Sequence, residues 1–91
     1  MLGLGGWRPA LGQEQSYHDL ICGYDWPCSE AMSVMWCESK GDAHAENGGS
    51  RGLFQIHVIH RARVDGNIDS LYIPEVNVRV AYEIWTEQGW L

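Results

Sequence analysis

The clearest helical signal in the chain is CSEAMSVMWCESKG, residues 28–41. Apolar and small residues recur there at the helical period of about 3.6 residues, at Cys28, Met32, Met35, Trp36 and Ser39. Asp25-Trp26-Pro27 suits a helix start, with proline in the first turn, and Gly41 suits a C-terminal stop. The pattern therefore predicts a helix over this stretch, ending at Ser39.

A second strong helix is predicted from Pro74 to Gln88, with Gly89 as its stop. The shorter predicted elements are helical turns at residues 15–22 and 58–64 and turns at residues 42–51 and 65–67. Gly52 to Ile56 is a short apolar run that fits either a strand or the start of a buried helix. We expect a small, mainly α domain with a minimal strand element over residues 14–91, after a flexible lead-in at residues 1–13.

The composition bounds the class of protein. A chain of 91 residues has room for one domain, and 45% hydrophobic residues with five tryptophans exclude a disordered segment. Acidic residues outnumber basic ones 12 to 6, and no basic cluster is present, which argues against a nucleic-acid partner. No run of 18 apolar residues occurs, so no membrane span is predicted. The first 12 residues do not resemble a signal peptide.

The three cysteines leave the pairing open. Cys28 and Cys37, if they share one helix, lie roughly 13 Å apart along its axis, which is too far for a disulfide. Cys22 therefore pairs with one of them, or no disulfide forms. No Cys-x-x-Cys or nearby histidine spacing of a metal site surrounds them, so no metal is predicted there.

Glu38 is the residue with the clearest potential for chemistry. It lies on the last turn of the first strong helix, where the negative end of the helix dipole disfavours an ionised carboxylate. Aromatic and methionine neighbours would desolvate the group and act in the same direction. A carboxyl group that keeps its proton near neutral pH can protonate a glycosidic oxygen. The alternative is a solvated glutamate at the edge of a structural helix.

The surrounding pattern resembles a known family. Trp36-Cys37-Glu38-Ser39-Lys40-Gly41, a turn-rich loop, and Gly52-Leu53-Phe54-Gln55-Ile56-His57 resemble the lysozyme-like domain of soluble lytic transglycosylases and goose-type lysozymes. Pro74-x-x-Asn77 with Ala81-Tyr82 is similar to the asparagine-led helix of that family. The similarity runs from about Trp26 to Trp90. It implies a lysozyme-like α+β fold and a peptidoglycan-cleaving muramidase acting on the β-1,4 bond between N-acetylmuramic acid and N-acetylglucosamine.

The resemblance also implies roles for individual residues. Glu38 matches the single catalytic glutamate, which acts as general acid and base. The residues that match substrate-binding positions are Ser39, Gly52, Leu53, Phe54, Gln55, Asn77 and Tyr82. No cofactor is implied, and the expected partner is the glycan strand of peptidoglycan, bound by a monomer.

Several of these residues have structural alternatives. Gln55 fits a polar residue at the end of a buried strand, Asn77 a helix-start residue, and Tyr82 a core residue beside Ile84 and Trp85. The aromatic residues Trp26, Trp36, Trp85 and Trp90 fit either sugar-stacking faces or core packing.

His57-x-x-His60 is a candidate metal pair, with His44 or an aspartate as third ligand. No glutamate accompanies the pair in a metalloprotease pattern, so a packed or exposed histidine pair is the favoured interpretation and no metal is predicted.

The reaction type depends on a second carboxylate. An inverting hydrolase needs one to activate water, whereas a lytic transglycosylase uses one acid and the muramoyl 6-hydroxyl as nucleophile. The candidates are Asp42, Glu46, Asp65 and Asp69. None matches a family position, so a single acid and transglycosylation are favoured. Relatives often continue beyond Gly89-Trp90-Leu91 with Pro-Trp and another cysteine, which suggests a truncated C-terminus and an unpaired thiol here.

Rival interpretations remain for the function. One is a hydrolytic lysozyme, and another is a non-catalytic glycan-binding or phage tail module. A third is an interaction domain whose apolar stripe, Val76, Val80 and Ile84, is exposed for a partner. For the leading interpretation, an endolysin-like or exported enzyme, we expect action at the cell wall or outside the cell, either as an exported protein or with a phage.

Overall fold

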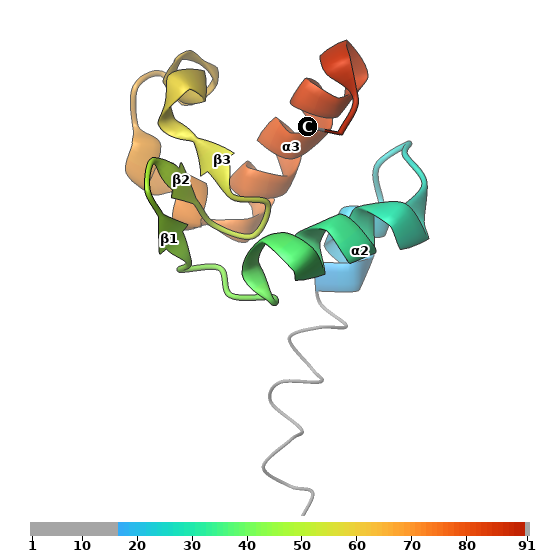
Figure 1. Cartoon of the computed structure of the whole chain (residues 1–91). Coiled ribbons are helices and arrows are strands. Elements are labelled where there is room, and N and C mark those ends of the chain that lie inside the picture. Colours follow the sequence, from blue (N-terminus) through green and yellow to red (C-terminus); the bar gives the residue numbers. More distant parts are fainter. Residues whose placement is uncertain (1–16, 91) are drawn as a thin grey trace, which may run out of the picture.

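The computed structural model describes residues 17–90 and shows a mainly helical domain with a small antiparallel sheet (Figure 1). After a short helical segment at residues 17–22, the elements are α2 (Cys28–Ser39), β1 (Glu46–Asn47), β2 (Ser50–Arg51), β3 (Ile56–His57), the 3-10 helices η2 (Val58–Val64) and η3 (Ile68–Tyr72), and α3 (Pro74–Gln88). The prediction of a small, mainly α domain with a minimal strand element is therefore confirmed. The lead-in predicted at residues 1–13 lies outside the described residues.

Helix α2 is confirmed, with two corrections. Its C-terminal cap is Lys40, one residue before the predicted glycine, in the left-handed conformation with φ of 55°. The buried face consists of Ala31, Met35 and Ser39. Trp36, which the helical period assigned to that face, is 46% exposed because it lies one position around the helix from Met35.

The sheet forms where the sequence contains Asn47-Gly48-Gly49-Ser50. β1 and β2 pair as a hairpin in the register Glu46 with Arg51, and β3 adds to β2 with Arg51 opposite Ile56. The Gly52–Ile56 run, left open between strand and helix, is mostly a turn that enters β3 only at Ile56. Gly52 is required there: with φ of 82°, a Cβ atom would collide with the Leu71 carbonyl oxygen and the Asn77 side chain.

Helix α3 closes the core over the sheet and α2. It begins at Pro74 and is followed by Gly89 at φ of 76°, as predicted. Two residues of its apolar stripe, Val80 and Ile84, are 0% and 7% exposed. They pack into a core whose fully buried members include Ile21, Met35, Leu53, Leu71 and Val78. The stripe is therefore part of the core, which corrects the interpretation of an exposed docking face.

A disulfide joins Cys22 to Cys28 and so ties the helical segment at residues 17–22 to the start of α2. Cys37 is exposed and has a free thiol. Nowhere within residues 17–90 is there a helix both long and apolar enough to cross a bilayer.

Candidate functional site

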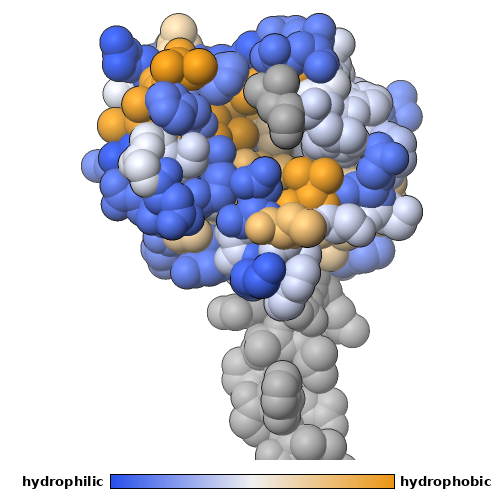
Figure 2. Space-filling view, viewed as in Figure 1, coloured by the Kyte–Doolittle hydropathy of each residue, from blue (hydrophilic) through white to orange (hydrophobic). Residues whose placement is uncertain are grey.

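A cleft of about 180 Å³ opens between the end of α2 and the segment that leads from the 52–55 turn into η2. In Figure 1, α2 faces β3 and η2 across this opening, and α3 lies between them. Its lining is mostly apolar and comes from Val34, Phe54, Ile56, Ile59, Ala81, Ile84 and Trp90, with Glu38, Gln55, His57, His60 and Gly89. Figure 2 shows hydrophobic surface inside a recess on this face, with hydrophilic residues around it.

Glu38 is the only carboxylate among the described residues that line the cleft. The last turn of α2 presents its side chain, which is exposed and makes no hydrogen bond or ion pair within residues 17–90. The desolvation expected from methionine and aromatic neighbours is therefore not observed, because Met35 lies on the buried face of the helix. An exposed and unpartnered carboxyl group remains available to a ligand.

Ser39 supports the end of α2 and does not line the cleft. It is 7% exposed, its hydroxyl donates to the Met35 carbonyl oxygen at 3.3 Å, and it accepts from the Gly41 N–H at 3.2 Å. These bonds tie the hydroxyl to the last turn of α2 and to the residue that follows its cap. Ser39 therefore stabilises the helix end that carries Glu38. It does not occupy the substrate-binding position that the resemblance implies.

Gln55 lies at the cleft, but its amide is bonded to the protein. Its nitrogen donates to the carbonyl oxygens of Ala45 and Gly52 at 3.1 Å and 3.0 Å. Its oxygen accepts from the Asn47 side chain at 3.0 Å. The backbone of Gln55 has φ of 51°, so the side chain leaves the turn toward the hairpin. In this conformation the amide braces the sheet.

Asn77 is fully buried and connects three segments. Its side-chain oxygen accepts from the Phe54 N–H at 2.8 Å, and its nitrogen donates to the carbonyl oxygens of Arg51 and Leu71, each at 2.9 Å. The sequence predicts a substrate contact at Asn77, whereas in the structure the residue is 0% exposed and both polar atoms of its side chain are bonded to the protein. Asn77 fixes the backbone that enters the cleft at Phe54.

The four other predicted binding residues divide in the same way. Gly52 and Leu53 are buried beneath the cleft, and Leu53 is 0% exposed. Phe54 lines the cleft. Tyr82 does not line it and instead packs against Tyr24 and Trp26, with ring centroids 4.9 Å and 5.5 Å away. The core alternative for Tyr82 therefore describes its position.

Trp90 forms one end of the cleft, which the sequence named only as one of four aromatic candidates. Its indole N–H donates to Glu30 of α2 at 2.7 Å, and its ring lies nearly parallel to Phe54, with 5° between the planes and 6.5 Å between the centroids. Trp26 and Trp85 pack behind it at 5.2 Å and 6.0 Å. The chain therefore presents an aromatic wall close to Phe54.

His57 and His60 also line the cleft, a role that the sequence analysis missed. Their position directly after Gly-Leu-Phe-Gln was the available signal. The Nδ1 atom of His57 accepts from the Ile59 N–H at 3.1 Å, and that of His60 accepts from the Arg63 side chain at 3.3 Å. Burial, followed by the charges of Arg63 and His57, lowers the pKa of His60. A neutral His60 then carries its proton on Nε2.

The metal alternative for these histidines finds no support in their arrangement. Within residues 17–90, one group of three potential ligands is gathered, and it comprises His18, Cys22 and Cys28. His57 and His60 belong to no such group, and His44 lies against the Tyr72 ring, with centroids 6.1 Å apart.

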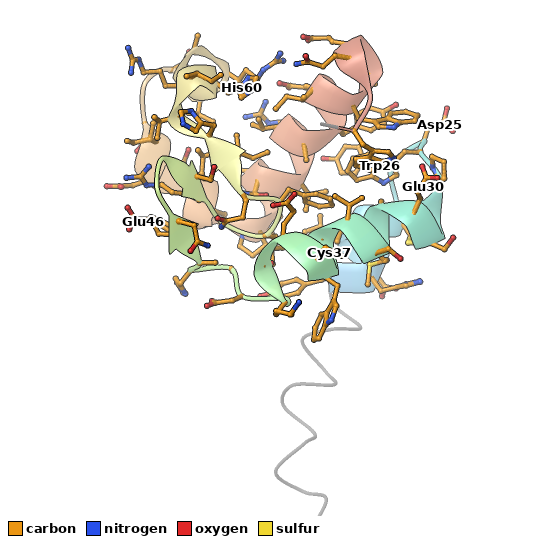
Figure 3. The ribbon with its side chains drawn as sticks, in the orientation of Figure 1. Asp25, Trp26, Glu30, Cys37, Glu46 and His60 are labelled. Carbon is orange, nitrogen blue, oxygen red and sulfur yellow. A yellow bond between two sulfur atoms is a disulfide. The ribbon has the colours of Figure 1, made fainter. Side chains whose placement is uncertain are left out.

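None of the four candidate second carboxylates lines the cleft. Asp42 accepts from the His44 N–H at 2.9 Å, and Asp65 and Asp69 are exposed elsewhere. Glu46 accepts from Arg51 and from the Tyr72 hydroxyl, each at 3.4 Å, at the outer edge of the sheet (Figure 3). The cleft thus contains one carboxyl group and two imidazoles within the part of the chain described.

Comparisons with known proteins add no relative: no protein-family model, no curated protein and no solved structure matches the chain.

Proposed function

We propose that this protein cleaves the glycan strands of peptidoglycan between N-acetylmuramic acid and N-acetylglucosamine, with Glu38 as general acid and base. The observation that carries the proposal is the position of Glu38, the single carboxylate among the described residues that line a mostly apolar cleft. The motif resemblance assigns the same residue to catalysis. The substrate would place the activity at the cell wall, outside the cell or with a phage particle.

The reaction needs one proton donor that later accepts a proton. Glu38 would protonate the glycosidic oxygen while the bond from that oxygen to C1 of the muramoyl residue breaks. The carboxylate so formed would then take the proton of the 6-hydroxyl of the same muramoyl residue as its oxygen bonds to C1. The products are a strand with a free 4-hydroxyl and a strand that ends in 1,6-anhydro-muramic acid.

The absence of a second carboxylate from the described cleft lining favours this transglycosylase over a hydrolase. An inverting hydrolase would need an acid and a base about 6.5–9.5 Å apart, with water between them. The aromatic wall of Phe54 and Trp90 suits the C–H faces of a sugar ring. The single carboxylate and the aromatic wall are both properties of the cleft, and both support the proposal.

Mass spectrometry of the products released from purified sacculi tests the proposal. We expect anhydro-muramic ends with the wild type and none with Glu38→Gln. Glu75→Gln is the matched control, because Glu75 is an exposed glutamate on the first turn of α3 and does not line the cleft. Reducing-end products would instead indicate a lysozyme.

The same sacculi distinguish a non-catalytic module. If neither the wild type nor Glu38→Gln releases products while both co-sediment with the sacculi, the chain binds glycan strands without cleaving them. That outcome would refute the enzyme and favour a glycan-binding or tail component.

A further inference from the structure

His18, Cys22 and Cys28 converge at the junction between the helical segment at residues 17–22 and α2. Their potential ligand atoms all lie within 4.8 Å of one another, and the Nε2 atom of His18 is 3.7 Å from the Cys28 sulfur. His18 and Cys22 are four residues apart on one helical segment, so they share a face. The sequence spacing hides this group, because five residues separate the two cysteines.

The loop at residues 23–27 brings Cys28 back to this face, and contacts other than the disulfide hold it there. The Trp26 indole N–H donates to the Ile21 carbonyl oxygen at 2.7 Å, and the Tyr24 N–H donates to the same oxygen at 3.3 Å. Trp26 is only 7% exposed and packs against Phe54 and Trp90. Because these contacts do not involve the disulfide, we expect the two cysteine Cα atoms, 4.9 Å apart, to stay close when the disulfide is reduced.

One separation already suits a tetrahedral zinc site, and the two sulfur atoms, bonded to each other here, must move apart when the disulfide is reduced. With bonds of about 2.3 Å to sulfur and about 2.0–2.1 Å to nitrogen, the ligand atoms of such a site lie about 3.5–3.8 Å apart. The 3.7 Å between His18 Nε2 and the Cys28 sulfur falls in that range. The Asp19 carboxylate is 3.5 Å from His18 Nδ1, on the other side of the ring, where a hydrogen bond orients a metal-bound imidazole.

We propose that the reduced chain binds one zinc ion through His18, Cys22 and Cys28, so that a metal bridge takes the place of the disulfide. Reduction transfers two electrons from a dithiol or phosphine reductant and two protons from solvent, and the sulfur–sulfur bond gives two thiols. The ion then binds two thiolates and the neutral imidazole, and two protons are released. Exposed His18 leaves the fourth position open to water.

This pairing gives the chain a cross-link in either redox setting. Where oxidants act, the disulfide joins residues 17–22 to α2, and where thiols stay reduced, zinc joins the same residues. Cys37 is not part of the group and is exposed on α2. The proposal is independent of glycan cleavage.

Cobalt(II) is the probe for this site, because a tetrahedral thiolate complex of Co²⁺ absorbs in the near-ultraviolet and the visible. The chain, reduced with a phosphine, should develop both bands, saturate at one equivalent of Co²⁺ and lose them when Zn²⁺ is added. The oxidised chain should show none. Cys37→Ser is the matched cysteine control and should bind like the wild type.

His18→Ala is the decisive variant, because His18 is exposed and its removal leaves the disulfide able to form in the oxidised protein. We expect Co²⁺ affinity to fall by about tenfold or more, since even the hydrogen-bond partners of metal ligands cost about 10- to 100-fold when removed. Cys22→Ser should remove most of the near-ultraviolet intensity.

Four outcomes would overturn the proposal: no bands in the reduced wild type, unchanged affinity in His18→Ala, loss of the bands in Cys37→Ser, or loss of the near-ultraviolet circular dichroism on reduction. The last would show that the loop at residues 23–27 does not keep the cysteines together.

Discussion

The two walls of the cleft treat their polar side chains in opposite ways. On the α2 wall, Glu38 makes no hydrogen bond or ion pair within the described residues. On the opposite wall, the amide of Gln55 makes three hydrogen bonds to the hairpin and the turn, and that of buried Asn77 makes three more behind it. The family motif includes Glu38, Gln55 and Asn77, but their roles in the structure differ. Glu38 is free to bind a ligand, whereas the amides of Gln55 and Asn77 are bonded to the protein and hold the backbone in place.

The largest expected effect separates activity from stability at Glu38. Glu38→Gln should lower the rate of product release from sacculi by about 100-fold or more, because it removes the only carboxyl group of the described cleft. The free energy of unfolding should change by less than about 0.5 kcal/mol, since the side chain is exposed. Paired rate and urea measurements check both. If Glu38→Gln loses stability as well as activity, Glu38 supports the fold and its loss of activity does not show a catalytic role.

Asn77 should behave in the reverse way. Asn77→Ala leaves one buried N–H and two carbonyl oxygens without partners, so the free energy of unfolding should fall by about 3 kcal/mol. Asn77→Asp keeps the acceptor for Phe54 but loses both donors, and should be destabilised at least as much. Urea denaturation of both variants measures this. A loss below about 1 kcal/mol would contradict the role of Asn77 as the central tie.

Gly52 tests the close approach beneath the same wall. Gly66→Ala is the matched control: Gly66 has φ of 84° and open space around a built Cβ, whereas Gly52 has φ of 82° and no room. Backbone strain alone should cost Gly66→Ala about 1 kcal/mol. Gly52→Ala should lose about 2 kcal/mol more, because the new methyl group meets Leu71 and Asn77. Equal losses of unfolding free energy in Gly52→Ala and Gly66→Ala would mean that Leu71 and Asn77 move aside for the new methyl group at no cost.

The smallest effect concerns His60. The pKa of His60 is lowered in the folded protein, so the unfolded chain binds its proton more tightly. Above the ordinary value of 6.5 both states are neutral and His60 has no effect, and as the pH falls below that value, folding stability decreases. Glu87 accepts a hydrogen bond from Arg63, which lowers the pKa of Glu87 from its ordinary value of 4.5. Glu87 therefore titrates at lower pH than the range in which His60 affects stability.

Comparing wild type with His60→Gln by urea denaturation at about pH 8 and about pH 5 isolates this contribution. The difference in unfolding free energy should shift in favour of the variant at the lower pH. No shift would mean that the imidazole is as well solvated as in the unfolded chain.

The sequence predicts the two long helices because proline and glycine mark their ends and apolar residues recur between them. It predicts a turn through Asn47-Gly48-Gly49-Ser50 but not the paired strands β1 and β2 on either side of that turn, because residues 42–51 have the composition of a loop. It does not predict the turn before β3, because non-glycine Gln55 takes a positive φ that only the surrounding hydrogen bonds stabilise. It also leaves the disulfide open, since the partner of Cys22 depends on the path of the loop at residues 23–27.

The candidate site was predictable only in part. The resemblance of the end of α2 and of Gly52-Leu53-Phe54 to the lysozyme-like motifs implies a cleft position for Glu38, and Glu38 lines a cleft in the structure. The directions of the Gln55 and Asn77 amides depend on tertiary partners: Ala45 lies 10 residues from Gln55, and Phe54 and Arg51 lie 23 and 26 residues from Asn77. Trp90 reaches the cleft through its bond to Glu30, 60 residues away in sequence, and no local pattern predicts that contact.

The three closely packed indoles of Trp26, Trp85 and Trp90 give the protein an intrinsic fluorescence signal at the cleft. Trp90 touches the cleft, hydrogen-bonds to Glu30 and lies within 5.2 Å and 6.0 Å of the Trp26 and Trp85 rings. Rings this close exchange excitation energy, so a change at one alters the emission of all three. Binding of a saccharide in the cleft would therefore change the intrinsic tryptophan fluorescence. A Trp90→Phe variant is the control for that change.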